Sequence, residues 1–167
     1  MKLIHYSKDP ISSLDNRNYD QSKLSWQAKP NGLWVSVEGL TAQHNYNWKE
    51  WCEAEEYRIE FLGISYEITL KESAKILHLK SAQEIFVFSK LYHLKTRDWD
   101  AEYDTYQLDW NKVKVIYQGI IIAPYQWECR LALESSWYYG WDCSSGCIWD
   151  LTCIKEFSEM NNERGKS

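Results

Sequence analysis

Large aromatic rings are the feature that most constrains this chain. Its 167 residues include 10 Trp, 12 Tyr and 4 Phe, but only 7 Gly and 3 Pro. So many apolar rings favour burial, and the small number of glycines and prolines limits how often the chain can turn sharply. Because a chain of this length buries about 70% of its unfolded surface, the composition predicts one domain whose interior is built largely from rings.

Charge and hydrophobicity narrow the class of protein further. Charged residues make up 26% of the chain and hydrophobic residues 44%, which is typical of globular domains and excludes a disordered or collagen-like protein. The formal net charge is −5, whereas proteins that bind nucleic acid through its phosphates usually carry positive charge. Nucleic acid is therefore not the expected partner.

Targeting signals and cysteine usage predict a cytoplasmic protein. The segment 1–10 lacks the apolar core of a signal peptide, and no run approaches the roughly 18 apolar residues of a membrane helix. Five cysteines without a secretory signal predict reduced thiols. Their spacings match no zinc pattern, so no metal is expected. The same sequence would suit a protein injected into a host cytoplasm.

Hydrophobic periodicity predicts an α+β domain over residues 1–154, with a solvated, mobile tail over 155–167. Ile64, Tyr66, Ile68 and Leu70 alternate with polar residues, as in a half-buried strand. The predicted strands are 2–7, 33–37, 64–70, 74–79, 120–123 and 147–151. The predicted helices are 10–14, 47–57, 81–92, 109–118 and 127–133.

Capping residues mark the starts of the longer helices. Asn47 with Glu50, and Ser81 with Glu84, have the spacing of a capping box, and Asp109 is a third candidate cap. Gly119 is expected to terminate the helix that begins at Asp109. The acidic loop 94–106 has no periodicity and is longer than most connections, which favours a role in recognising a partner.

Three segments place polar residues inside strongly apolar or aromatic stretches. His5, Tyr6 and Ser7 follow two aliphatic residues on the first strand, and Ser36 follows Trp34 and Val35 on the second. In the third segment Asp142 follows a run of rings that ends in Trp141 and precedes Ser144-Ser145-Gly146. By position alone Asp142 is either a cap of that turn or a deliberately placed charge.

The order of these segments resembles the ADP-ribosyltransferase family, in particular its short bacterial and phage-encoded members. They open with an apolar-His-Thr/Tyr-Ser strand, continue with Gly-apolar-aromatic-x-Ser, and carry an acid ahead of Gly-x-Cys-aromatic. The matching positions are His5 and Ser7, then Trp34 and Ser36, then Asp142 before 146–149. The Gln/Glu-x-Glu pair of arginine-modifying members is absent, which leaves the acceptor open.

The resemblance implies a split, mixed or antiparallel sheet with flanking helices and NAD bound in a cleft. His5 would bind a ribose hydroxyl, and the backbone around Tyr6 and Ser7 would pair with the nicotinamide amide. Trp34, with Tyr6 or Trp141, would stack on the nicotinamide, while Asp142 would stabilise the cation that forms on the ribose. Ser36 belongs to the same site, and Lys29 is a candidate for the pyrophosphate with Arg17 and Lys23.

The sequence is compatible with more than one catalytic acid and more than one function. Glu38, Glu134 and Asp150 compete with Asp142 as the catalytic acid. The expected reaction is transfer of ADP-ribose from NAD to a macromolecule, with proteins among the candidate acceptors, or to water. The resemblance alone suggests a role as a toxin, an effector or an anti-defence protein. The rival functions are an aromatic-rich module that binds carbohydrate or single-stranded nucleic acid and an inactive interaction domain of the same fold.

Overall fold

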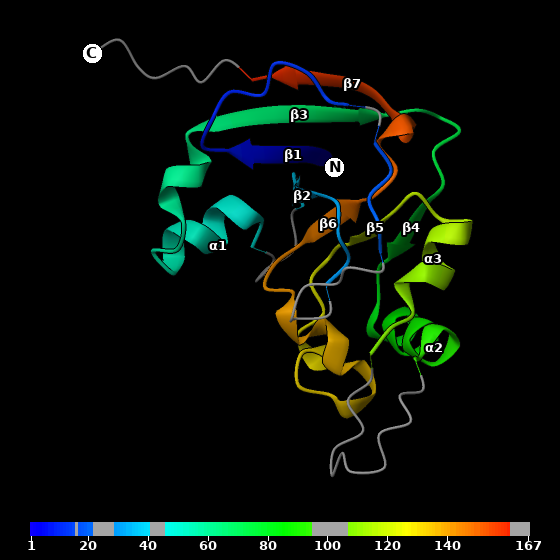
Figure 1. Ribbon diagram of the computed structural model, residues 1–167. Helices are drawn as coiled ribbons and strands as arrows, with labels where there is room; N and C mark the ends of the chain where they lie inside the picture. Colours follow the sequence, from blue (N-terminus) through cyan, green and yellow to red (C-terminus); the bar gives the residue numbers. More distant parts are fainter. Residues whose placement is uncertain (16, 22–28, 41–45, 95–106, 161–167) are drawn as a thin grey trace.

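A mixed β-sheet of seven strands forms the centre of the protein (Figure 1), in the spatial order β4-β5-β6-β2-β1-β3-β7. The computed structural model describes residues 1–15, 17–21, 29–40, 46–94 and 107–160. Only β4 and β5 pair in parallel; the other neighbours are antiparallel. The strands are β1 (Lys2–Ser7), β2 (Leu33–Glu38), β3 (Ile64–Leu70), β4 (Ile76–Leu79), β5 (Gly119–Ile122), β6 (Ser145–Ile148) and β7 (Ile154–Glu159). The predicted α+β class with a mixed sheet is confirmed.

Alternating residues of the strands face two separate hydrophobic clusters. Ile120 and Cys147 belong to the ring-rich cluster on one face, whereas Ile121 and Ile148 belong to an aliphatic cluster on the other. The period of two in a strand produces this division. Gly146 lies between β5 and β2, where an added Cβ would be 2.7 Å from the carbonyl oxygen of Ile120, so only glycine allows this close approach.

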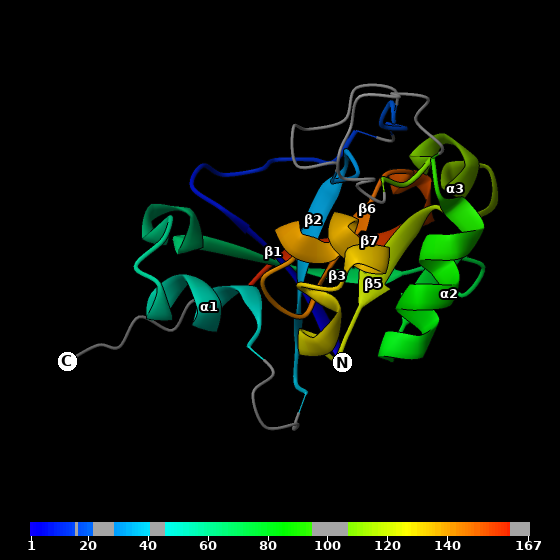
Figure 2. The same cartoon turned by 90° about the horizontal axis from the view of Figure 1, so that it is seen from below.

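Among the described residues, α2 and α3 contribute side chains to the ring-rich cluster, whereas α1 packs beside β2. Figure 2 shows α1 on one side of β2 and α2 and α3 on the other. Asn47 and Glu50 form the expected capping box of α1, and the side chains of Ser81 and Asp109 cap α2 and α3. These caps satisfy amide groups that lack partners within the first helical turn. The helices are α1 (Trp48–Ala54), α2 (Ala82–Tyr92) and α3 (Trp110–Ile116), with 3-10 turns at Ile59–Leu62, Trp127–Cys129, Leu133–Gly140 and Leu151–Cys153.

Four local predictions are wrong. Residues 10–14 form no helix. The helix predicted over 127–133 is a 3-10 turn at Trp127–Cys129, and a second 3-10 segment begins at Leu133. Gly119 does not terminate α3, which ends at Ile116, but begins β5, where a Cβ would be 2.9 Å from the carbonyl oxygen of Cys147. The strand predicted over 147–151 lies earlier, at Ser145–Ile148, because a 3-10 turn begins at Leu151.

The expected solvated tail from residue 155 also needs correction. Residues 155–159 belong to β7, which pairs with β3 along the edge of the sheet. The ring of Phe157 stacks on that of Tyr66 at 4.5 Å and 9°, and this contact gives the charged edge strand an apolar anchor. Residues 161–167 lie outside the described residues, as do residues 95–106 of the acidic loop.

Candidate functional site

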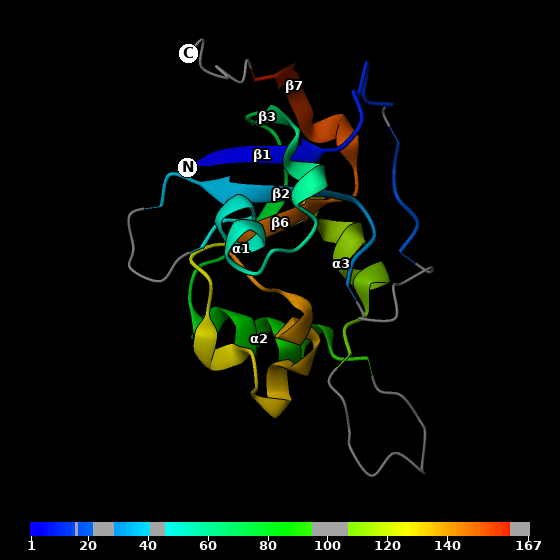
Figure 3. The same ribbon diagram turned by 90° about the vertical axis from the view of Figure 1, so that its left-hand side faces the viewer.

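Among the described residues, β1 stops pairing with β2 before His5, Tyr6 and Ser7. β1 pairs with β2 only through Lys2, Leu3 and Ile4, the last opposite Ser36. From His5 to Ser7, β1 continues to pair with β3, and β2 pairs with β6 instead. Figure 3 shows these strands stacked in the order β7, β3, β1, β2 and β6. Within the described chain, the β2-facing edge of β1 therefore has no ladder partner beyond Ile4.

The His5 ring bridges the point where the two strands stop pairing. Its Nδ1 lies 2.8 Å from the carbonyl oxygen of Trp34. A carbonyl only accepts, so Nδ1 carries the hydrogen, and Nε2 is left as an acceptor in the neutral ring. Burial lowers the pKa of His5, and the bond to Trp34 opposes this only in part. The neutral form is therefore favoured, and it suits a group that accepts a hydroxyl proton.

Trp34 lies in contact with a cation and with a second indole. The ammonium of Lys29 is 5.2 Å from the Trp34 ring centroid, and the Trp141 ring is 4.8 Å away with a tilt of 59°. Burial lowers the pKa of Lys29, while Asp142 opposes the shift. A cation over an indole gains from the negative ring face. Lys29 therefore lies against Trp34, where the sequence analysis expected nicotinamide.

Trp141 is part of the core. Only 1% of its surface is exposed, so protein covers the ring that was expected to stack on nicotinamide. Its Nε1 is buried and has no hydrogen-bond partner among the described residues. Trp141 thus supports Trp34 from the protein side, and a ligand would reach Trp34 without touching the Trp141 ring in this arrangement.

Asp142 forms an ion pair with Arg130, a residue that the sequence analysis did not identify. The Arg130 Nη2 lies 3.2 Å from Asp142 Oδ1, and both side chains are partly exposed. Burial raises the pKa of Asp142, whereas Lys29 and Arg130 act in the opposite direction. Arg130 also lies over the Tyr139 ring. In the sequence, Arg130 stands out only as a basic residue that precedes the aromatic run from Trp137 to Trp141.

The alternative role of Asp142 as a turn cap finds no support in the hydrogen bonds. The Ser144 amide donates to the carbonyl of Tyr46 at 3.0 Å, and the Ser145 hydroxyl donates to the carbonyl of Cys143. The Asp142 carboxylate instead accepts from Arg130. The Asp142 carboxylate therefore pairs with Arg130 at the edge of the ring cluster and does not cap the turn.

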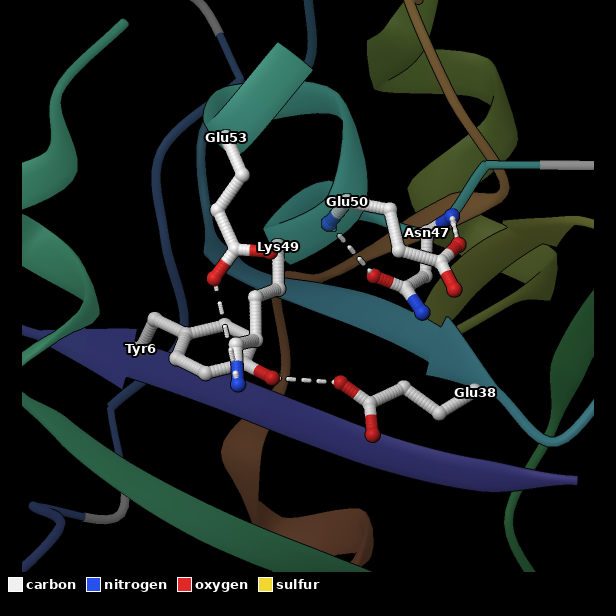
Figure 4. A network of polar contacts seen from close by, with 6 residues as sticks. All are labelled: Tyr6, Glu38, Asn47, Lys49, Glu50 and Glu53. Atoms are coloured by element: carbon white, nitrogen blue, oxygen red, sulfur yellow. Dashed lines mark hydrogen bonds and ion pairs between the residues drawn. The ribbon is translucent and has the colours of Figure 1, made fainter. Parts of the chain in front are cut away.

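The other polar residues of β1 and β2 have local partners, some of which Figure 4 shows. Tyr6 donates its hydroxyl to Glu38, beside the capping box of α1, and burial together with Glu38 raises the pKa of Tyr6. Ser7 donates to the carbonyl of Asp9. Ser36 is buried and accepts from the amide of Trp48 at 3.0 Å, which ties α1 to β2 and explains a serine in this apolar strand.

The competing acids lie in other environments. Asp150 accepts from Gln118 and Thr152, well within a separate polar network. Glu134 is exposed on a 3-10 turn, and Glu38 accepts from Tyr6. Of the pyrophosphate candidates, Arg17 pairs with Asp15 at 2.7 Å, and Lys23 lies outside the described residues. Asp142 is thus the acid whose chain neighbour, Trp141, contacts Trp34.

Comparison with models of protein families, with curated proteins and with solved structures finds no match to this chain. All five cysteines are free and buried. Within the described part of the chain, no three His, Cys, Asp or Glu side chains gather as a metal site would require. None of the described helices has the length and apolar character needed to span a membrane.

Proposed function

We propose that the protein is an NAD-dependent ADP-ribosyltransferase, with its site between the open edge of β1 and the group that we name the Trp34 cluster. The Trp34 cluster comprises Lys29, Trp34, Arg130, Trp141 and Asp142. One observation carries the proposal: His5 bridges to the Trp34 carbonyl where β1 and β2 stop pairing, and Trp34 in turn contacts the indole that precedes Asp142. The segments that carry Trp34 and Trp141 are thereby linked to the first strand.

Each group has a role in the chemistry of the proposal. The bond between the nicotinamide nitrogen and ribose C1′ breaks, and nicotinamide leaves with the electron pair. Positive charge then develops on the ribose, where the Asp142 carboxylate would stabilise it. The acceptor forms a new bond to C1′ and loses a proton. Backbone groups of β1 beyond Ile4, which have no ladder partner on the β2 side among the described residues, would hold the nicotinamide amide. Neutral His5 would accept from a ribose hydroxyl.

Lys29 adds a requirement to this proposal. Nicotinamide in NAD is a flat cation, and the Trp34 ring already contacts the Lys29 ammonium. Both cations favour the same aromatic partner, so NAD binding requires Lys29 to leave the ring. In its new position the ammonium would face the NAD pyrophosphate, the role that the resemblance implies for it. The acceptor is proposed to be a macromolecule, with water as a competing nucleophile.

The distribution of tryptophans argues against the rival aromatic binding module. Trp110, Trp137, Trp141 and Trp149 are all at most 3% exposed and pack against one another or their neighbours. A stacking platform needs ring faces in solvent. Among the described tryptophans, Trp127 is the one that is more than half exposed, at 53%.

The direct experiment measures nicotinamide release and the intact mass of lysate proteins after incubation with NAD. The wild-type protein should release nicotinamide and add one ADP-ribose to an acceptor. Trp34→Leu should abolish both, whereas Trp127→Leu, the matched control, should retain them with an unchanged melting temperature. Absence of nicotinamide release from folded wild-type protein at saturating NAD would leave the inactive interaction domain as the better explanation.

A further inference from the structure

A cavity of about 500 Å³ lies away from the Trp34 cluster, where β4 and β5 begin. Three segments line it: the connection from β3 to β4, the end of α3 with the residues that follow, and the turn after β6. Its volume is within the range of roughly 300–1,000 Å³ found for small-molecule sites. We name it the Gln118 cavity, after the residue that joins its walls.

Gln118 fixes the relative positions of the three segments. Its Nε2 donates to Asp150 Oδ2 at 2.8 Å and to Thr152 Oγ1 at 3.4 Å, and its Oε1 accepts from the Lys75 amide at 3.0 Å. Asp150 Oδ1 accepts from the amide and the hydroxyl of Thr152. Both oxygens of this carboxylate are thus occupied by wall residues, and the wall is held by hydrogen bonds.

Three lysines surround this network in a chain whose net charge is −5. Lys71 donates its ammonium to the Thr152 carbonyl at 2.6 Å. Within the described residues, the ammonium groups of Lys75 and Lys114 form no ion pair. The lysines outnumber the one carboxylate that lines the cavity, so the lining carries a net positive formal charge, which favours an anion.

The cavity also has an apolar rim. Val115 is 81% exposed and Ile116 51% exposed at the end of α3, and both line the cavity. The lining is otherwise mostly polar, so these two side chains are the apolar surface that an organic ligand could contact beside the lysines. The rim therefore fits a ligand that carries an apolar or aromatic part beside its anionic group.

We propose that the Gln118 cavity binds a small phosphomonoester with a flat apolar part, the chemistry of a mononucleotide. Lys75 and Lys114 contact the phosphate, with Lys71 beside them, and Val115 and Ile116 contact the apolar part. The site shares no residue with the Trp34 cluster, so this proposal does not depend on the proposed transferase activity.

Calorimetric titration with AMP, adenosine and inorganic phosphate tests the proposal. AMP should bind more tightly than either inorganic phosphate or adenosine, and its affinity should fall with added salt. The Lys75→Ala/Lys114→Ala variant should weaken AMP binding about tenfold or more, because two charge-assisted contacts are lost. Lys90→Ala is the matched control, because Lys90 occupies the last turn of α2 as Lys114 does that of α3.

Further results would overturn the assignment. No heat with millimolar AMP, equal affinity for AMP and inorganic phosphate, or unchanged AMP binding in the double variant would each contradict it. Trp34→Leu separates the two proposals, since it should abolish NAD cleavage while AMP binding persists. If Trp34→Leu abolished AMP binding and the lysine variant did not, AMP would belong to the Trp34 cluster and the cavity would have no assigned ligand.

Discussion

The Trp34 cluster and the Gln118 cavity use charge in opposite ways. In the Trp34 cluster, Arg130 pairs with Asp142 and Lys29 lies over an indole, next to a ring core that excludes water. In the Gln118 cavity the lysines stand at the rim of an open space. Charges interact more strongly where water is scarce, and our two proposals differ accordingly: stabilisation of a developing charge beside the ring core, and reversible binding of an anion at the open cavity.

The two regions also differ in what a ligand must displace. A ligand can enter the Gln118 cavity without moving a core side chain. At the Trp34 cluster, Lys29 must leave the indole first. The comparison predicts that substitutions in the Trp34 cluster alter turnover and folding, whereas substitutions of cavity lysines alter ligand affinity with little effect on folding, since exposed substitutions usually change stability by less than about 0.5 kcal/mol.

The largest effect is expected for Asp142→Asn. If the carboxylate stabilises the ribose cation, this variant should lower NAD turnover by about 10²–10³-fold, or roughly 2.7–4 kcal/mol in the barrier. NAD affinity should change far less. Steady-state nicotinamide release and NAD titration measure the two quantities. Glu134→Gln, on an exposed acid outside the cluster, is the control. Wild-type turnover in Asp142→Asn would refute its catalytic role.

A second prediction compares two indoles that are each 1% exposed. Trp149 donates its Nε1 hydrogen to the Tyr117 carbonyl at 2.7 Å, whereas the Nε1 of Trp141 has no partner among the described residues. Trp149→Phe removes the donor of this partly buried bond and should cost about 0.5–1.5 kcal/mol more than Trp141→Phe. Chemical denaturation measures both, and equal losses would show that Trp141 makes an equivalent bond in solution.

Ser36→Ala should have a smaller effect. The variant removes the acceptor of the Trp48 amide and should lower the free energy of unfolding by about 1 kcal/mol, as loss of a helix cap does. Denaturant unfolding measures the loss, and Ser12→Ala, at an exposed position, is the control. An unchanged midpoint for Ser36→Ala would mean that the bond between α1 and β2 contributes nothing to stability.

The smallest predicted effect is on the pH dependence of folding. Burial lowers the pKa of His5 below its unfolded value of 6.5, so below pH 6.5 the unfolded chain binds more protons than the folded one. The stability contributed by neutral His5 is present above pH 6.5 and is lost as the pH falls through the folded-state pKa. His5→Asn should therefore lose less stability on acidification than the wild type.

Unfolding titrations at a series of pH values measure this difference. His78→Asn is the matched control, because burial, together with Lys80, also lowers the pKa of His78, on a strand away from the Trp34 cluster. In the His78 variant, the free energy of unfolding should keep the pH dependence that His5 contributes. Identical curves for the wild type and His5→Asn would contradict the assignment.

The sequence predicted those elements that are specified by residues close together in the chain. Asn47 and Glu50 lie three residues apart and cap each other's backbone, so the start of α1 could be predicted from spacing alone. The alternation of apolar and polar residues from Ile64 to Leu70 is likewise visible within seven consecutive residues, and it predicted β3. β7 was missed because its sequence is mostly polar and its apolar residues, Ile154 and Phe157, pack against parts of the protein far away in the chain.

The candidate site was predicted only in part. The sequence named His5, Trp34 and Asp142 as members of one site, and contacts link the three segments that carry them. It did not predict Arg130, whose ion pair with Asp142 depends on how the 3-10 turns fold back. It also placed Trp141 and Ser36 at the ligand, whereas the first is buried and the second holds α1.

The sequence by itself determined the α+β class, the capped helix starts and the ring-rich core, because periodicity, capping and the burial of apolar area act over a few residues or through composition. The tertiary structure decided where β1 stops pairing with β2, which cation contacts Trp34, and which three distant segments line the Gln118 cavity. Those features depend on side chains separated by tens of residues, whose contacts form only when the sheet order brings their strands together.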